Sequence, residues 1–299
     1  MKLTEYNTSL IRNRQGVDYL SEATTAAILA MILIGCADTI NKRARQRAIP
    51  IGSYLIVQSV SYTLVILLMA LMSGGIKWQR ADLVYGLLGA VFGFAGFTLM
   101  LHSLTRGHAG VNYAIFRSSF AFSAGSAIVI LDEALYINKI IGIMLACLAI
   151  ALFFYDRNHL SVVRRSLLMA FAAMLIAAAF QMIIKLSTRV FSSPISYILL
   201  MNLFFFGFVV VYALIARNFR FPRTTFVLAP ANGVMMALAT FFYVTALQKG
   251  ELSTVMPIIQ LSFTFTAILA AIFLKDRIST RQIFGIICAG IAIIAMGAI

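Results

Sequence analysis

One arginine interrupts an otherwise apolar run of the sequence. Arg117 lies about nine residues into the run 109–131, or roughly 13 Å along a helix that rises 1.5 Å per residue. An arginine at such depth in a membrane costs at least about 2.5–3.5 kcal/mol, so it must face a partner or a cavity. Its guanidinium fork suits a carboxylate or a phosphate, which makes Arg117 a candidate anchor for an anionic substrate. A structural ion pair, or a side chain that extends to the membrane surface, is the alternative.

Asp38 is the only acid well inside another apolar run, 23–42. It precedes Lys42 by one helical turn, so an i,i+4 pair is possible, and Arg117 on another helix is the second candidate partner. A carboxylate at membrane depth is also a candidate proton carrier, and Asp38 is therefore a candidate for proton coupling. The alternative is a salt bridge near the membrane surface.

Uncharged polar side chains occur in the same kind of run. Asn112 and Tyr113 share the segment of Arg117, and Tyr113 lies four residues before Arg117, on the same helix face. Such a face lines a pocket in some transporters and is ordinary packing in many helices. The remaining candidates for substrate binding are Gln181, Tyr243 and Gln260, and Asn41, Asn202 and Asn232 are further uncharged candidates within the runs.

Three residues are candidates for gating or for shaping the pathway. Lys42 and Lys185 end two apolar runs, where a lysine either guards one mouth of a pathway or reaches the lipid headgroups. Pro257 removes a backbone hydrogen bond from the run 252–274 and is expected to kink it. Such breaks often adjoin a transport site, although a purely structural kink explains Pro257 equally well.

The elements that carry these residues follow from composition. The chain has 299 residues, of which 62% are hydrophobic and only 11% are charged, too few to cover a soluble globule. A soluble enzyme, a disordered chain and a secreted disulfide scaffold are thereby excluded. The net charge of +14 falls mostly in short breaks between apolar runs, which favours contact with anionic lipids over nucleic acid.

Ten runs are long enough to cross a membrane as helices. They lie near 23–42, 51–73, 81–103, 109–131, 138–155, 166–186, 194–216, 224–248, 252–274 and 281–298. The sequence therefore predicts an all-α integral membrane protein with ten transmembrane helices. The polar stretch 1–22 is expected to lie at the membrane surface or to be disordered.

No residue set for catalysis, a cofactor or a metal is visible. Cys36, Cys147 and Cys288 each stand alone in apolar runs, where they are expected to act as small hydrophobic residues. The three histidines form no metal-binding pattern, and no phosphate-binding loop is present. The chain is accordingly expected not to be an enzyme, to need no cofactor, and to draw its energy from a gradient or from substrate exchange.

An internal repeat divides the chain. An offset of 143 residues pairs Gly107 with Gly250 and Gly142 with Gly285, and it aligns two Ser-Phe-x-Phe runs that begin at Ser119 and Ser262. Each repeat holds five spans, so the second must enter the membrane from the opposite side. Inverted repeats of this kind form a site near the membrane midplane and support alternating access. A duplicated scaffold without transport activity is the alternative.

The expected organisation follows from this repeat. Segment 1–22 is polar, 23–155 is the first five-helix repeat, 156–165 is a linker and 166–299 is the second repeat. The offset also places Gln181 opposite Asp38 and Gln260 opposite Arg117. The first repeat would then carry the charged half of a central site.

The chain resembles the drug/metabolite transporter superfamily in its ten-helix, EamA-type form. The resemblance covers nearly all of the chain from residue 23. It rests on the span count, the repeat and these local patterns: Lys42 and Lys185 at matching helix ends, Asp132-Glu133 before Gly142, Asp276 before Gly285, and Pro257. Two positions depart from the pattern, namely Ala114 at the first-repeat equivalent of Pro257 and the run Lys275-Asp276-Arg277.

The resemblance implies a secondary transporter in a plasma or inner membrane that exports or exchanges small metabolites, such as amino acids, nucleotide precursors or drugs. We expect a small-molecule substrate, protons as a candidate coupling ion, contact with membrane lipids, no nucleic acid, and a monomer or weak homodimer. Glu133 is expected to stabilise the start of the fifth span. The alternatives are a non-transporting scaffold or partner subunit and, less favoured, a membrane-embedded lipid enzyme.

The orientation in the membrane stays open. The resemblance implies a cytoplasmic N-terminus, which places nine Lys/Arg on the inner side and fourteen on the outer side. Cytoplasmic loops normally carry the excess, so the count opposes that orientation. A wrong span count near the N-terminus, or lysines and arginines that belong to the pathway, are two explanations.

Overall fold

The structure is a computed structural model that describes residues 2–104, 109–154, 164–216, 220–275 and 278–297, in which all regular structure is helical. The helices are α1 (Lys2–Gln46), α2 (Ile51–Met72), α3 (Arg80–Leu104), α4 (Ala109–Arg117), α5 (Ser119–Ile130), α6 (Ile137–Phe154), α7 (Arg164–Ser187), α8 (Pro194–Ile215), α9 (Thr225–Lys249), α10 (Leu252–Gln260), α11 (Ser262–Leu274) and α12 (Thr280–Gly297). Within the described residues, nine segments are long and apolar enough to cross a membrane, and α12 adds a shorter apolar helix. The predicted all-α membrane fold is confirmed.

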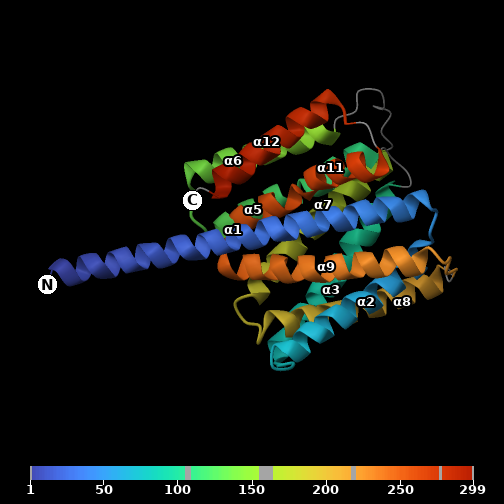
Figure 1. The fold of residues 1–299 in the computed structure, drawn as a ribbon, viewed down its shortest axis with the longest axis horizontal. Helices are drawn as coiled ribbons and strands as arrows, with labels where there is room; N and C mark the ends of the chain where they lie inside the picture. The colour runs from blue at the N-terminus through green and yellow to red at the C-terminus, as the bar shows by residue number, and fades with distance from the viewer. Residues whose placement is uncertain (1, 105–108, 155–163, 217–219, 276–277, 298–299) are drawn as a thin grey trace.

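Helix α1 is longer than its membrane span. The span begins at Glu22, and the polar stretch before it continues the helix beyond the bundle (Figure 1). The sequence predicts a surface or disordered segment there, whereas residues 2–21 are helical in the structure.

Several connections meet at one end of the bundle. At the start of α3, Asp82 accepts hydrogen bonds from the Ser192 backbone N–H (3.1 Å) and hydroxyl (2.6 Å) in the α7–α8 loop. Glu133 in the α5–α6 loop accepts the backbone N–H that begins α10 (2.7 Å). Lys249 at the end of α9 pairs with Glu22 of α1. We call this the Glu22 end, and the opposite end, which carries the α1–α2 turn, the Arg47 end.

The two repeats run in opposite directions. Because α2 leads into α3 at the Glu22 end, α1 must finish at the Arg47 end, whereas α7 finishes at the Glu22 end. Helices α1 and α7 are the first helices of their repeats, so the repeats are inverted.

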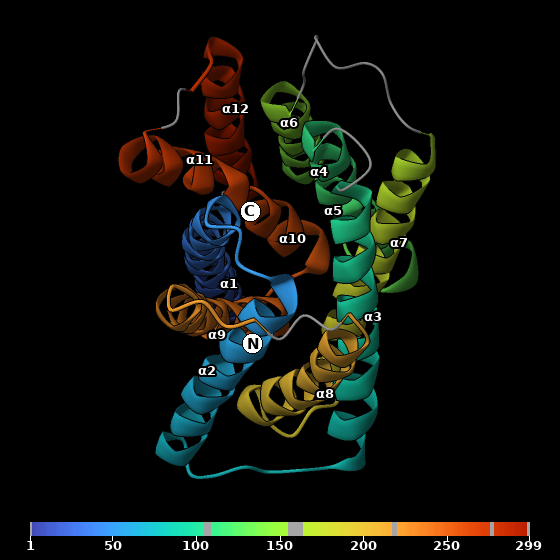
Figure 2. The same ribbon diagram turned by 90° about the vertical axis from the view of Figure 1, so that its right-hand side faces the viewer.

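Helix packing follows the same symmetry. Helix α1 packs on α9 as α7 packs on α3, and α2 packs on α8 while α6 packs on α12 (Figure 2). Helix α1 lies between α9 and the α10–α11 span in this view. At one crossing a Cβ on Gly233 of α9 would collide with the Ser61 hydroxyl and lie 2.5 Å from the Gln58 carbonyl oxygen. That close approach requires glycine.

The fourth and ninth spans are each broken into two helices. The fourth span divides between Arg117 and Ser119, and the ninth between Gln260 and Ser262. The sequence predicts a continuous helix over 109–131, because the run is apolar on both sides of the break. The two breaks lie 143 residues apart, so they are one feature of the repeat, and each places a candidate site residue at the end of a half-helix.

Candidate functional site

Arg117 ends α4 and contacts both repeats. Its Nη1 donates to Oε1 of Gln260 (3.1 Å) and to Oγ of Ser262 (2.8 Å), both in the second repeat. Its Nη2 donates to Oδ2 of Asp38 (2.8 Å) in α1. Of the two partners considered for Asp38, the structure pairs it with Arg117.

The contacts around Arg117 have counterparts across the repeat. Gln260 takes the place of Arg117 in the second repeat, and Ser262 takes that of Ser119. The contact between Arg117 and Ser262 therefore corresponds to the one between Nε2 of Gln260 and Oγ of Ser119 (3.4 Å). Gln181 donates to the same Ser119 hydroxyl (2.9 Å). These side chains lie about the pseudo-two-fold axis that relates the repeats.

The pair of Arg117 and Asp38 joins helices that have different neighbours. Among the described helices, α1 packs closely on α9, α10 and α11, whereas α4 packs on α6 and α7. The side chains of Arg117 and Asp38 are 13% and 32% exposed. A carboxylate in hydrocarbon is strongly disfavoured, so the exposed part of Asp38 is expected to face water or a ligand rather than lipid.

Arg117 has unused donor capacity. A guanidinium carries five N–H groups, and its bonds to other described residues use two on Nη1 and one on Nη2. Nε–H and one Nη2–H remain for a ligand. A carboxylate or phosphate accepts two such donors in a bidentate arrangement.

Three expected site residues have other surroundings. Asn112 is buried and donates to the Ser103 carbonyl (2.9 Å) and the Ser166 hydroxyl (2.8 Å), which ties α4 to α3 and α7. Tyr113 stacks on Phe154 of α6 at 6.2 Å between ring centroids. Tyr243 lies buried in the core that surrounds α9. Burial, ring stacking and hydrogen bonds between helices are typical of packing residues, and the role of these three residues in binding stays a prediction.

Pro257 lies inside α10, four residues before the break at Leu261. The expected interruption of the ninth span is present. The first repeat breaks at the equivalent residue, Ser118, although Ala114 replaces the proline there. The proline is therefore not needed for the break.

A cluster of charges holds the turn between α9 and α10 at the Glu22 end. Lys185 donates to the carbonyl oxygens of Leu247 (2.7 Å) and Gly250 (2.6 Å). The buried ammonium of Lys139 pairs with Glu251. We call Glu133, Lys139, Lys185 and Glu251 the α9–α10 clamp. Lys42, the counterpart of Lys185, is exposed at the Arg47 end.

Glu133 lies in the turn before α6, as the sequence predicts, but the helix that its carboxylate caps is a different one. It is expected to stabilise α6, but its carboxylate accepts the N–H groups of Leu252 (2.7 Å) and Ser253 (2.9 Å) at the start of α10. Glu251, the N-cap residue of α10, makes no side-chain cap bond. Glu133 thus caps a helix of the other repeat.

Sequence reasoning also missed the two serines that complete the network. Ser119 and Ser262 are aligned by the repeat, and each follows a candidate polar residue by two positions. That offset was the available signal. Among the described residues, no group of three or more His, Cys, Asp or Glu side chains is arranged to hold a metal ion.

The fold and site of the described residues define a class: a membrane protein of nine or ten spans built from two inverted repeats, with polar residues at two broken helices. The EamA-like transporter family matches residues 23–155 and 164–298 of the chain, and the protein belongs to this family. It is therefore a multi-pass membrane protein of a family that transports small solutes. No curated protein matches the chain. One solved structure, titled only "Crystal structure of protein", is similar in fold, with a TM-score of 0.76, 12% identity, and coverage of 92% of this chain and 95% of that chain.

Proposed function

We propose that this protein is a secondary transporter that moves a small zwitterionic metabolite by alternating access, as an exporter or exchanger of the inner membrane. The observation that carries the proposal is that Arg117 bonds to Gln260, its own counterpart in the other repeat. A side chain that bonds across the pseudo-two-fold axis sits where a substrate has to pass between the repeats.

Charge balance favours a zwitterion over a simple anion. The pair formed by Arg117 and Asp38 is neutral when both groups are ionised, so an added anion leaves one net charge in a low-dielectric site. A zwitterion adds no net charge, because its carboxylate binds the remaining N–H groups of Arg117 while its ammonium contacts Asp38. Protonation of Asp38 offers the same balance for an anion, which makes protons the proposed coupling ion for anionic substrates.

The two broken spans support a moving site. Half-helices that end at Arg117 and Gln260 can tilt separately from the parts that follow them, as the discontinuous helices of transporters do. The α9–α10 clamp closes the Glu22 end, and its release would open that mouth. We assign no role in gating to Pro257 beyond its position in α10, and we propose Lys42 and Lys185 as gate residues.

Counterflow in proteoliposomes tests the proposal. The assay uses a panel of labelled neutral amino acids, with matched carboxylates that lack the ammonium, and matched amines that lack the carboxylate, as competitors. We expect counterflow of zwitterions, weak competition by either single-charge analogue, and loss of at least about tenfold in rate for Arg117→Gln. Arg80→Gln, an exposed residue at the Glu22 end, is the control. Equal rates for Arg117→Gln and the control would remove Arg117 as the anchor.

A further inference from the structure

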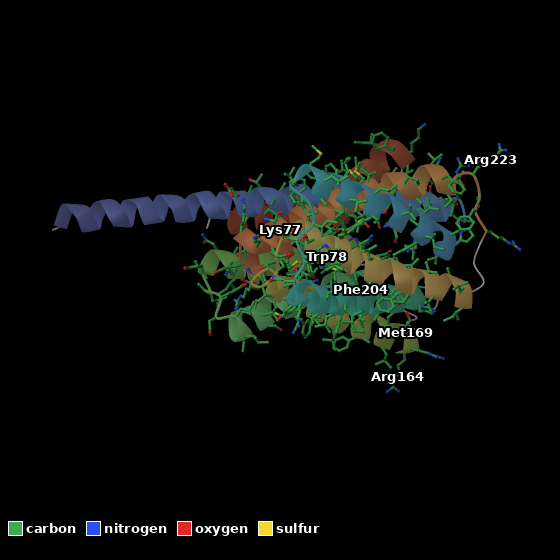
Figure 3. All side chains as sticks on the ribbon, turned by 90° about the horizontal axis from the view of Figure 1, so that it is seen from below. Lys77, Trp78, Arg164, Met169, Phe204 and Arg223 are labelled. Atoms are coloured by element: carbon green, nitrogen blue, oxygen red, sulfur yellow. The ribbon has the colours of Figure 1, made fainter. Side chains whose placement is uncertain are left out.

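The charged residues of the two ends differ in a way that the site does not explain. At the Arg47 end, ten described lysines and arginines are all exposed. They are Lys42, Arg43, Arg45, Arg47, Arg164, Arg165, Arg220, Arg223, Lys275 and Arg281. We call them the basic face. Figure 3 shows Arg164 and Arg223 at this end of the bundle, away from the N-terminal part of α1.

Cations at the Glu22 end are fewer and largely engaged. Lys139 is buried against Glu251, and Lys185 donates to backbone carbonyls. Lys249 is exposed but paired with Glu22. Among the residues from Glu22 onward whose side chains are described, three other cations at this end are exposed, namely Lys77, Arg80 and Arg189.

Acids are distributed in the opposite sense. Described acids at the Glu22 end include Glu22, Asp82, Asp132, Glu133 and Glu251. Among the described residues of the Arg47 end, the nearest acid is Asp38, which lies within the span and is bonded to Arg117. The basic face therefore has strong positive charge where the helices leave the membrane.

The fold bears on both explanations for the imbalance that the sequence left open. The helix from Glu22 to Gln46 is long and apolar enough to cross a membrane, which supports the expected count of spans near the N-terminus. The cations engaged inside the protein, Lys139 and Lys185, belong to the Glu22 end. Setting them aside, together with Lys42 as the proposed gate residue of the Arg47 end, still makes the imbalance larger.

We propose that the basic face lies on the cytoplasmic side, against the anionic phospholipid headgroups of that leaflet. Excess lysine and arginine near span ends is retained in the cytoplasm, and anionic lipids attract such residues. Glu22 then lies on the outer side. The end of α12 lies there too, because it packs against Gly142 near the start of α6. This orientation is the reverse of the one that the family resemblance implies, and it does not depend on the proposed substrate.

Single cysteines in a chain with Cys36, Cys147 and Cys288 replaced by alanine test the orientation. Asn138→Cys reports on the Glu22 end and Thr224→Cys on the Arg47 end; both positions are exposed. In sealed right-side-out vesicles, a membrane-impermeant maleimide is expected to label Asn138→Cys at once and Thr224→Cys only after detergent is added. The reverse pattern overturns the proposal. An alkaline phosphatase fused after the last residue, expected to be active, measures the same orientation independently.

Charge variants test the role of the basic face itself. The triple variant Arg43→Gln, Arg45→Gln and Arg47→Gln is expected to make part of the Thr224→Cys population accessible before detergent, because the retained charge is reduced. The matched control is Lys77→Gln, Arg80→Gln and Arg189→Gln, which removes the same number of cations from the Glu22 end and should leave the pattern unchanged. Unchanged labelling in the first triple variant would show that these cations do not set the orientation. Transport activity enters neither measurement.

Discussion

Arg117 donates a hydrogen bond to Gln260, the residue that occupies its own place 143 positions later in the other repeat. Two equivalent positions can meet only on the axis that relates the repeats. Since one is a cation and the other a neutral amide, the site is symmetric in backbone but not in charge. Under the proposed function, we expect a substrate bound there to have one orientation, with its anionic group toward α4.

Asp38→Asn tests the charge balance of the site. Removal of the carboxylate leaves the guanidinium without its ionic partner, so the affinity for anions should rise. The affinity for zwitterions should fall, because their ammonium group loses its contact with Asp38. We expect the half-saturation ratio of zwitterion to matched carboxylate to rise by at least about tenfold. Competition assays in proteoliposomes measure this ratio, and an unaltered ratio would contradict the zwitterion assignment.

The two equivalent serines are expected to differ in importance. Ser262 accepts a bond from the charged Arg117, whereas Ser119 bonds to the neutral amides of Gln181 and Gln260. Bonds to charged groups contribute about 1.5–3 kcal/mol and neutral ones about 0.5–1.5 kcal/mol. Ser262→Ala should therefore weaken substrate binding more than Ser119→Ala, as measured by half-saturation in counterflow. The opposite order would place the substrate nearer the amides.

Glu133→Ala should loosen the Glu22 end. The carboxylate caps α10, and loss of a cap costs about 0.5–2 kcal/mol, which shifts an opening equilibrium by about 2- to 30-fold. The rate at which a maleimide labels a cysteine at buried Val255 measures this opening. Asp132→Asn is the control, because Asp132 is the exposed neighbour in the same loop. A rate in Glu133→Ala no faster than in the control would show that the cap does not hold this mouth closed.

Gly233→Ala should destabilise the contact between α2 and α9. The added methyl group would collide with the Ser61 hydroxyl, and overpacking of this kind costs about 1–3 kcal/mol. Gly207→Ala is the control, since a Cβ there meets nothing within 4 Å and alanine favours a helix. Thermal unfolding in detergent should show a lower midpoint temperature for Gly233→Ala only. Equal midpoints would mean that α2 and α9 move apart enough to accept the methyl group without loss of stability.

The spans and the inversion could be predicted because apolar length and an odd number of spans per repeat are properties of the sequence itself. The pairing of Asp38 with Arg117 was one of two alternatives, since spacing cannot decide between a helical neighbour and another helix. The break at Ser118 could not be predicted, because no proline or glycine marks it, whereas Pro257 indicated an interruption of the ninth span. Glu133 was assigned to the nearest helix in sequence, whereas the helix that lacks its own cap lies in the other repeat.

The cap that Glu133 provides makes the second half of the chain depend on the first. A duplicated unit is expected to fold alone, yet α10 relies on a carboxylate that only the first half supplies. Separated at the linker, the second half would lack the carboxylate that accepts the N–H groups of Leu252 and Ser253. The halves have thus diverged from two copies into complementary parts, because one half supplies the carboxylate that caps a helix of the other.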